Sequence, residues 1–61
     1  MTRDEIRHEM KLRIEAVGVA VEWALWEIAH NDFSQMSKRL EDMKMYSERA
    51  RLDLDASHLV A

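Results

Sequence analysis

The segment 12–29 predicts one helix with apolar side chains on two opposite faces. Each of two apolar stripes advances in steps of four and three, the repeat of an α-helix, and the stripes are offset by two positions. At about 100° per residue, this offset places them roughly 200° apart around the helix axis. The first stripe consists of Met10, Ile14, Val17, Val21, Ala24 and Ile28, and the second consists of Leu12, Ala16, Val19, Trp23 and Trp26. A folded-back second helix can cover only one stripe, so the chain is expected to need a partner.

Length and composition point to the same need. A chain of 61 residues buries only about 60% of the surface that its unfolded form exposes, so a single-chain core is marginal. The chain has no cysteine, which excludes disulfides and thiolate metal sites. A hydrophobic content of 48% and a charged content of 34%, with no proline and one glycine, favour long helices over loops or strands. Oligomerisation is therefore the expected source of additional burial.

The fold class expected from these patterns is all-α, an antiparallel helical hairpin that forms a single domain. Helix one is expected over about residues 3–30, the turn over about 30–32, helix two over about 33–56 and a tail over 57–61. The short connection favours antiparallel neighbours.

Each expected helix has a start signal. Thr2 and Glu5 have the spacing of a capping box, in which a hydroxyl and a carboxylate each accept from the other residue's amide. Asp32 and Gln35 repeat that spacing and predict the start of the second helix. Between the helices, Asn31 can adopt the left-handed conformation that ends a helix.

The second helix carries one main apolar stripe, and a weaker one at seven-residue spacing. The main stripe consists of Phe33, Met36, Leu40, Met43, Ser47, Ala50 and Leu54, and the weaker one of Met45, Leu52 and Leu59. We expect the stripe from Met10 to Ile28 to pack on the main stripe, which leaves the tryptophan stripe exposed. Two hairpins packed face to face would form a homodimeric four-helix bundle with a two-fold axis.

The tryptophan stripe is the predicted protein interface, with a second copy or with another chain. Its residues are Leu12, Ala16, Val19, Trp23 and Trp26. Tryptophan is enriched in binding hot spots, although the same side chains also serve in cores. The chain is therefore expected to be a small non-enzymatic protein-binding module, a homodimeric regulator, adaptor or inhibitor of a larger protein complex. In size and predicted architecture it resembles the small dimeric helical regulators and adaptors of bacteria and their phages, which assigns no residue a role.

Nucleic-acid binding is the first alternative function. The basic residues of the second helix would carry it: Lys38, Arg39, Lys44, Arg49 and Arg51. Acidic residues interrupt this run, and the net charge of the chain is −3. Because phosphate binding needs a net basic surface, a nucleic-acid partner is not favoured.

A helical metal site is the second alternative. Glu5 and His8 have the Glu-x-x-His spacing of carboxylate-bridged metal sites in bundles, as do Glu27 and His30. An antiparallel hairpin would bring Asp55 and His58 near the first pair, so the low-priority candidate ligands are Glu5, His8, Asp55 and His58. No cofactor is otherwise expected. No enzyme is expected either, because a two-helix unit offers little concavity for titratable groups.

The expected location is the cytoplasm. The N-terminal residues are charged and lack the apolar stretch of a signal peptide. The most apolar window, 17–29, contains Glu22 and Glu27 and is too short to span a bilayer. No membrane partner is expected.

Overall fold

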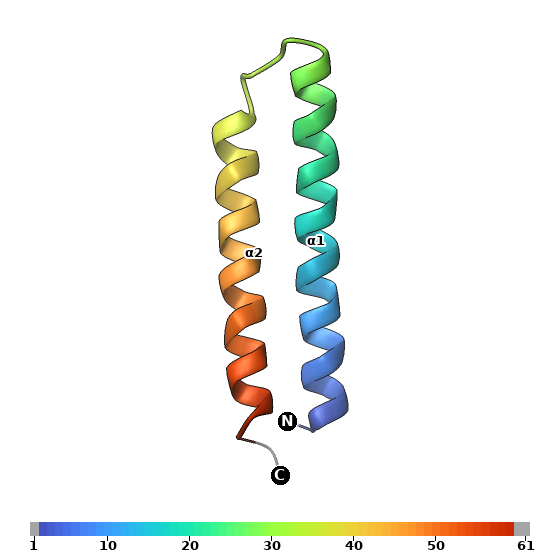
Figure 1. The fold of residues 1–61 in the computed structure, drawn as a ribbon, viewed down its shortest axis with the longest axis vertical. Helices are drawn as coiled ribbons and strands as arrows, with labels where there is room; N and C mark the ends of the chain where they lie inside the picture. Colours follow the sequence, from blue (N-terminus) through green and yellow to red (C-terminus); the bar gives the residue numbers. More distant parts are fainter. Residues whose placement is uncertain (1, 60–61) are drawn as a thin grey trace.

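The computed structural model describes residues 2–59 and contains two helices, α1 (Arg3–Ala29) and α2 (Met36–Ser57). The helices lie side by side and antiparallel, joined by one turn (Figure 1). The Cα atoms extend 48 Å along the helices and 15 and 11 Å across them, so the hairpin is a single layer. The predicted all-α helical hairpin is confirmed. Neither helix in the described part of the chain has an apolar stretch that could cross a membrane.

The start of α1 is the predicted capping box. The Thr2 hydroxyl oxygen accepts from the Glu5 amide at 3.2 Å. The Glu5 carboxylate accepts in return from the Thr2 amide at 3.4 Å and from the Thr2 hydroxyl at 3.0 Å. These bonds satisfy backbone groups that a helix end leaves without partners.

The end of α1 is fixed by Asn31, which adopts the left-handed conformation with φ 53°. The Asn31 amide donates to the Ile28 carbonyl at 3.1 Å, and the Asp32 amide donates to the Glu27 carbonyl at 2.8 Å. This pair of bonds is the Schellman motif, which closes a helix and reverses the chain.

The second predicted capping box is wrong. The helix α2 begins at Met36, and its N-cap residue, Gln35, makes no side-chain hydrogen bond to the helix. Asp32 instead accepts from the Ser34 hydroxyl at 2.7 Å and from the Ser34 amide at 3.2 Å. The Ser34 hydroxyl, and then the Ser34 amide, hold the pKa of the Asp32 carboxyl below its ordinary value. The carboxylate is thus used in a local turn before the helix starts.

The seam between the helices is narrow and rich in alanine. Its apolar buried residues are Ile6, Ala20, Ala24 and Ala50, at 2–7% exposed. The seam residues recur at helical spacing on α1 as Ile6, Met10, Arg13, Val17, Ala20, Ala24 and Glu27, and on α2 as Met36, Arg39, Met43, Tyr46, Ala50 and Asp53. Small side chains at the centre allow the helices to approach closely, but they bury little apolar surface.

The seam differs from the predicted packing. Met10, Val17 and Ala24 lie in it as expected, but Ile14 and Ile28, from the same predicted stripe, are 57% and 50% exposed. Of the large side chains expected opposite them, Phe33 in the turn and Leu40 and Leu54 on α2 are exposed too. A helix contacts one neighbour through a limited arc, and charged residues occupy part of that arc here. The large aliphatic side chains are therefore displaced to one flank.

Within residues 2–59, two ion pairs cross the seam. Arg39 Nε lies 2.7 Å from Glu27 Oε1, and Glu27 is only 3% exposed. Fourteen residues further along both helices, Arg13 Nε lies 3.6 Å from Asp53 Oδ2. Because the same offset separates the pairs on each helix, together they define the register in which α1 lies against α2.

The Glu27–Arg39 pair yields a double-substitution prediction. We expect Arg39→Met to lower the free energy of unfolding by about 3 kcal/mol, because it leaves a buried carboxylate without its partner. Adding Glu27→Leu should restore at least the original stability, because a well-packed apolar pair replaces a buried ion pair at little or no cost. Urea unfolding followed by circular dichroism measures both variants. An equal loss of unfolding free energy in the single and double variants would show that the unpaired Glu27 carboxylate is not the cause of the loss.

The Asn31 conformation yields a second prediction. We expect Asn31→Ala to cost about 1 kcal/mol, because a side chain with a Cβ and no local hydrogen bond is strained at positive φ. Asn31→Gly should cost nothing or stabilise the turn. Thermal unfolding of the two variants makes the comparison. A glycine variant as unstable as the alanine variant would mean that the Asn31 side chain itself, and not its backbone angle, holds the turn.

Candidate functional site

The hairpin leaves large apolar side chains exposed on both of its flanks. Within the described residues these are Leu12, Ile14, Val19, Val21, Trp23, Leu25, Trp26, Ile28, Phe33, Leu40, Met45, Leu52, Leu54 and Leu59. Scattered exposed apolar residues are normal on a protein surface, whereas contiguous ones indicate an interaction site. Helical spacing sorts most of them into two contiguous surfaces.

The first surface contains the five predicted interface residues and is called here the Trp face: Leu12, Ala16, Val19, Trp23 and Trp26. Ala16 is half-buried, and the four larger residues are 45–54% exposed. The two indole rings meet nearly at a right angle, with centroids 6.1 Å apart and an interplanar angle of 70°. With Glu22 they line a shallow surface hollow.

Each indole of the Trp face contacts a neighbouring side chain. The Trp26 ring stacks on the His30 ring at 3.9 Å, and His30 Nδ1 hydrogen bonds to the Trp26 carbonyl at 2.8 Å. The Arg39 guanidinium lies 5.5 Å from the centroid of the Trp23 ring, within the range of a cation–π interaction. Aromatic side chains that are already ordered lose less entropy on binding than mobile ones.

The α2 residues beside the Trp face are mostly polar or charged. A hollow next to the indoles is lined from α1 by Ala16, Val19, Ala20 and Trp23 and from α2 by Arg39, Asp42 and Tyr46. Toward the other end of the hairpin, Arg49 and Leu52 line a hollow with the Arg13–Asp53 pair. The Trp face on α1 is therefore apolar, and the neighbouring surface of α2 is mixed. This combination is typical of interfaces that form and dissociate.

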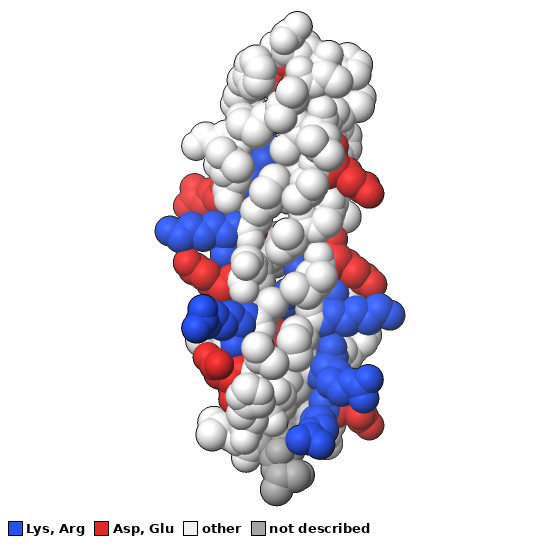
Figure 2. Space-filling model, viewed as in Figure 1, with Lys and Arg blue, Asp and Glu red and all other residues white. Residues whose placement is uncertain are grey.

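The second surface lies on the opposite side of the seam and was not expected from the sequence. It is called here the Ile–Leu strip and consists of Ile14, Val21, Ile28, Leu40 and Leu54, which repeat at multiples of seven residues on the two helices. These side chains are 37–57% exposed. Along the face turned to the viewer in Figure 2, a band of uncharged side chains runs almost the full length of the hairpin.

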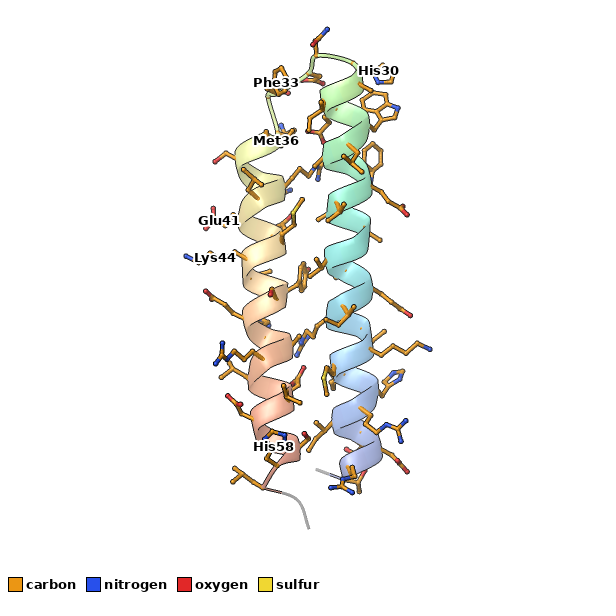
Figure 3. The ribbon with its side chains drawn as sticks, in the orientation of Figure 1. His30, Phe33, Met36, Glu41, Lys44 and His58 are labelled. Atoms are coloured by element: carbon orange, nitrogen blue, oxygen red, sulfur yellow. The ribbon has the colours of Figure 1, made fainter. Side chains whose placement is uncertain are left out.

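Charged side chains form both edges of the Ile–Leu strip (Figure 2). Helical spacing assigns Lys11, Glu15 and Glu22 to the α1 edge and Glu41, Lys44, Glu48, Arg51 and Asp55 to the α2 edge, while Arg7 lies in line with the strip, seven residues before Ile14. Glu41 and Lys44 point outward from α2, away from α1 (Figure 3). An apolar centre with charged edges is the pattern of one face of a helical bundle.

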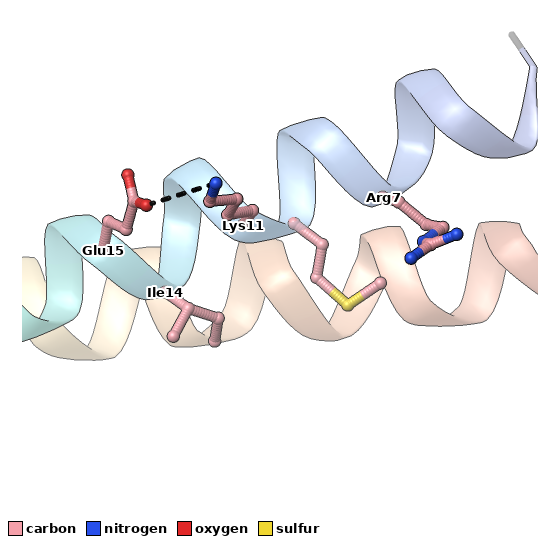
Figure 4. A pocket seen from close by; sticks show the side chains of 5 residues that line it. Arg7, Lys11, Ile14 and Glu15 are labelled. Carbon is pink, nitrogen blue, oxygen red and sulfur yellow. Dashed lines mark ion pairs between the residues drawn. The ribbon is translucent and has the colours of Figure 1, made fainter.

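One end of the strip is hollowed. The hollow is lined by Arg7, Met10, Lys11, Ile14 and Glu15, and Lys11 pairs with Glu15 at 4.0 Å beside it (Figure 4). Four of these residues have the spacing i, i+3, i+4 and i+7. That spacing forms the hole that receives a side chain of a neighbouring helix in knobs-into-holes packing.

The basic residues of α2 do not share one surface. Arg39 lies in the seam with Glu27, and Lys44 and Arg51 alternate with acidic residues on the outer edge. Lys38 and Arg49 occupy other positions of the helical repeat. The arrangement offers no continuous basic track for a phosphate backbone.

The candidate metal ligands are not brought together. Among residues 2–59, no group of three or more histidine, aspartate or glutamate side chains is placed to hold a metal ion. Glu5 instead caps α1 through Thr2. The predicted ligands Glu5, His8, Asp55 and His58 do not form such a group among the described residues.

Comparison of the chain with models of known protein families, with curated proteins and with solved structures gives no match. The functional assignment therefore depends on the two apolar surfaces and on the charges around them.

Proposed function

We propose that this chain is a small non-enzymatic protein-binding module that works as a homodimer and regulates a larger protein complex, as an adaptor or inhibitor. The observation that carries the proposal is that the largest apolar side chains lie on the surface of the hairpin and not between its helices. Alanines and ion pairs fill the seam, while the tryptophans and most of the large aliphatic side chains are exposed. Such surface is costly to leave in water, and binding of other protein surface removes the cost.

The two surfaces suit two different partners. The Ile–Leu strip is apolar on both helices, as in obligate interfaces. The Trp face combines two ordered indoles with polar groups from α2. Large aromatic side chains with a polar surround are typical of binding hot spots. We therefore assign self-association to the strip and the larger target to the Trp face.

Tryptophan emission tests this division. If the strip mediates self-association, the emission maximum should stay the same from the concentration at which the chain is monomeric to that at which it is dimeric. Trp23→Glu combined with Trp26→Glu should leave the dissociation constant of the dimer unchanged in sedimentation equilibrium. A blue shift on dimerisation, or loss of the dimer in the double variant, would place the second copy on the Trp face instead.

Photo-cross-linking in cells tests the protein-binding role. A photoreactive residue in place of Trp26 should give an adduct with a different, larger protein, identified by mass spectrometry. The same residue in place of Ile14 is the matched control and should give an adduct of two copies of this chain. If position 26 forms only the adduct of two copies, or none, the proposed target at the Trp face is wrong.

A further inference from the structure

We infer that the Trp face receives an arginine side chain of the target protein, in the hollow lined by Glu22, Trp23 and Trp26. The guanidinium lies against the two indoles and pairs with the Glu22 carboxylate. This inference depends on the target binding proposed above and adds the chemical group that the target presents. It is carried by the geometry of the indoles, and by an arginine that the chain itself holds with the same kinds of group.

The two indoles form a corner that is open to solvent. Their planes are inclined at 70°, their centroids are 6.1 Å apart, and each tryptophan is 50% exposed. The face of an aromatic ring is negative and attracts a cation, and the attraction is strongest for tryptophan. A cation in the corner can therefore contact both rings at once.

One side of each indole is already covered within the hairpin. The Trp26 ring stacks on the His30 ring, and the Arg39 guanidinium lies over the Trp23 ring. The hollow is lined by Glu22 and the two indoles, with no contribution from His30 or Arg39 among the described residues. It therefore borders the sides of the rings that these two neighbours leave open, and a group from another protein can occupy it.

Glu22 supplies the negative charge of the hollow. It is exposed, and among residues 2–59 it takes part in no ion pair, whereas Glu9, Glu15 and Glu27 each pair with a basic side chain. The Glu22 carboxylate is thus available to a basic group of another protein. The net charge of −3 also favours a basic partner.

The hairpin contains an example of a guanidinium held by a tryptophan and a glutamate. Arg39 Nε lies 2.7 Å from Glu27 Oε1, and the Arg39 guanidinium lies 5.5 Å from the centroid of the Trp23 ring. Glu22 and Trp23 provide the same two groups on the surface, with Trp26 as a second ring. The hollow therefore has the groups that already bind an arginine elsewhere in this chain.

The chemistry of the hollow favours arginine over lysine. A guanidinium is planar and weakly hydrated, so it can stack on an indole while its N–H groups donate to a carboxylate. An ammonium is compact and strongly hydrated, and in this hollow its three N–H donors would find one carboxylate. Arginine and tryptophan are also both enriched in binding hot spots.

An NMR titration of the whole chain with small cations tests the inference. The probe is glycyl-arginyl-glycine with blocked ends, compared with the matching lysine peptide and with tetramethylammonium at equal ionic strength. We expect the arginine peptide to shift the indole N–H signals of Trp23 and Trp26 to saturation, with a dissociation constant of roughly 10 to 100 mM. The lysine peptide and tetramethylammonium should bind at least about threefold more weakly, because neither combines stacking with bonds to a carboxylate.

Matched substitutions locate the site of binding. Glu22→Gln should weaken binding of the arginine peptide about threefold, because it removes the ion pair and leaves the indoles in place. Glu15→Gln removes the same charge from the same edge of α1, seven residues earlier, and should leave the dissociation constant unchanged. Equal effects of the two substitutions, or tighter binding of either other cation, would overturn the inference.

The outcomes separate this inference from the proposed function. If position 26 cross-links a larger protein in cells but the arginine peptide does not shift the indole signals, the arginine is wrong and target binding at the Trp face stands. A cross-linked segment of the target that contains no arginine has the same meaning. If position 26 cross-links no larger protein, the proposed target and its arginine are both wrong.

Discussion

The structure depends on how the seam between α1 and α2 is filled. Three alanines at its centre allow close approach, and the Glu27–Arg39 and Arg13–Asp53 pairs occupy positions that large aliphatic side chains would take in a self-sufficient hairpin. A buried ion pair contributes less to stability than apolar packing of the same volume, but it penalises any register that separates the charges. The seam therefore gains specificity of alignment at the expense of apolar burial.

The hairpin itself could be predicted because its signals are local. A capping box needs only Thr2 and Glu5, and the chain reversal needs only a residue such as Asn31 that tolerates positive φ. The seam could not be predicted by counting apolar periodicity, since that method assigns Arg13 and Glu27 to solvent. Their burial requires an oppositely charged partner on the other helix, and only the three-dimensional register reveals that partner. The sequence contains one signal for their burial: Arg13, Ala20 and Glu27 recur every seven residues, which places all three on the same side of α1.

The candidate interface could be predicted in part for the same reason. The Trp face follows from the spacing along one helix, and the structure places its five residues on one side of α1. The Ile–Leu strip combines residues from both helices, so it emerges only when the seam is known. The sequence alone predicts that its three aliphatic residues on α1 lie in the seam, because their helical spacing fits the seam and the strip equally well. The failure of the second capping box is of the same kind, since Ser34 competes for the Asp32 carboxylate.

Arg39 links the two parts of the molecule that have been described separately. Its guanidinium pairs with Glu27 in the seam and also lies over the Trp23 ring on the opposite flank from the strip. A shift of α2 by one helical turn, about 5.4 Å, would remove the cation from both groups at once. The electronic environment of Trp23 therefore reports the alignment of the helices. The indole is a natural optical sensor, already present in the chain, for any slip of one helix along the other.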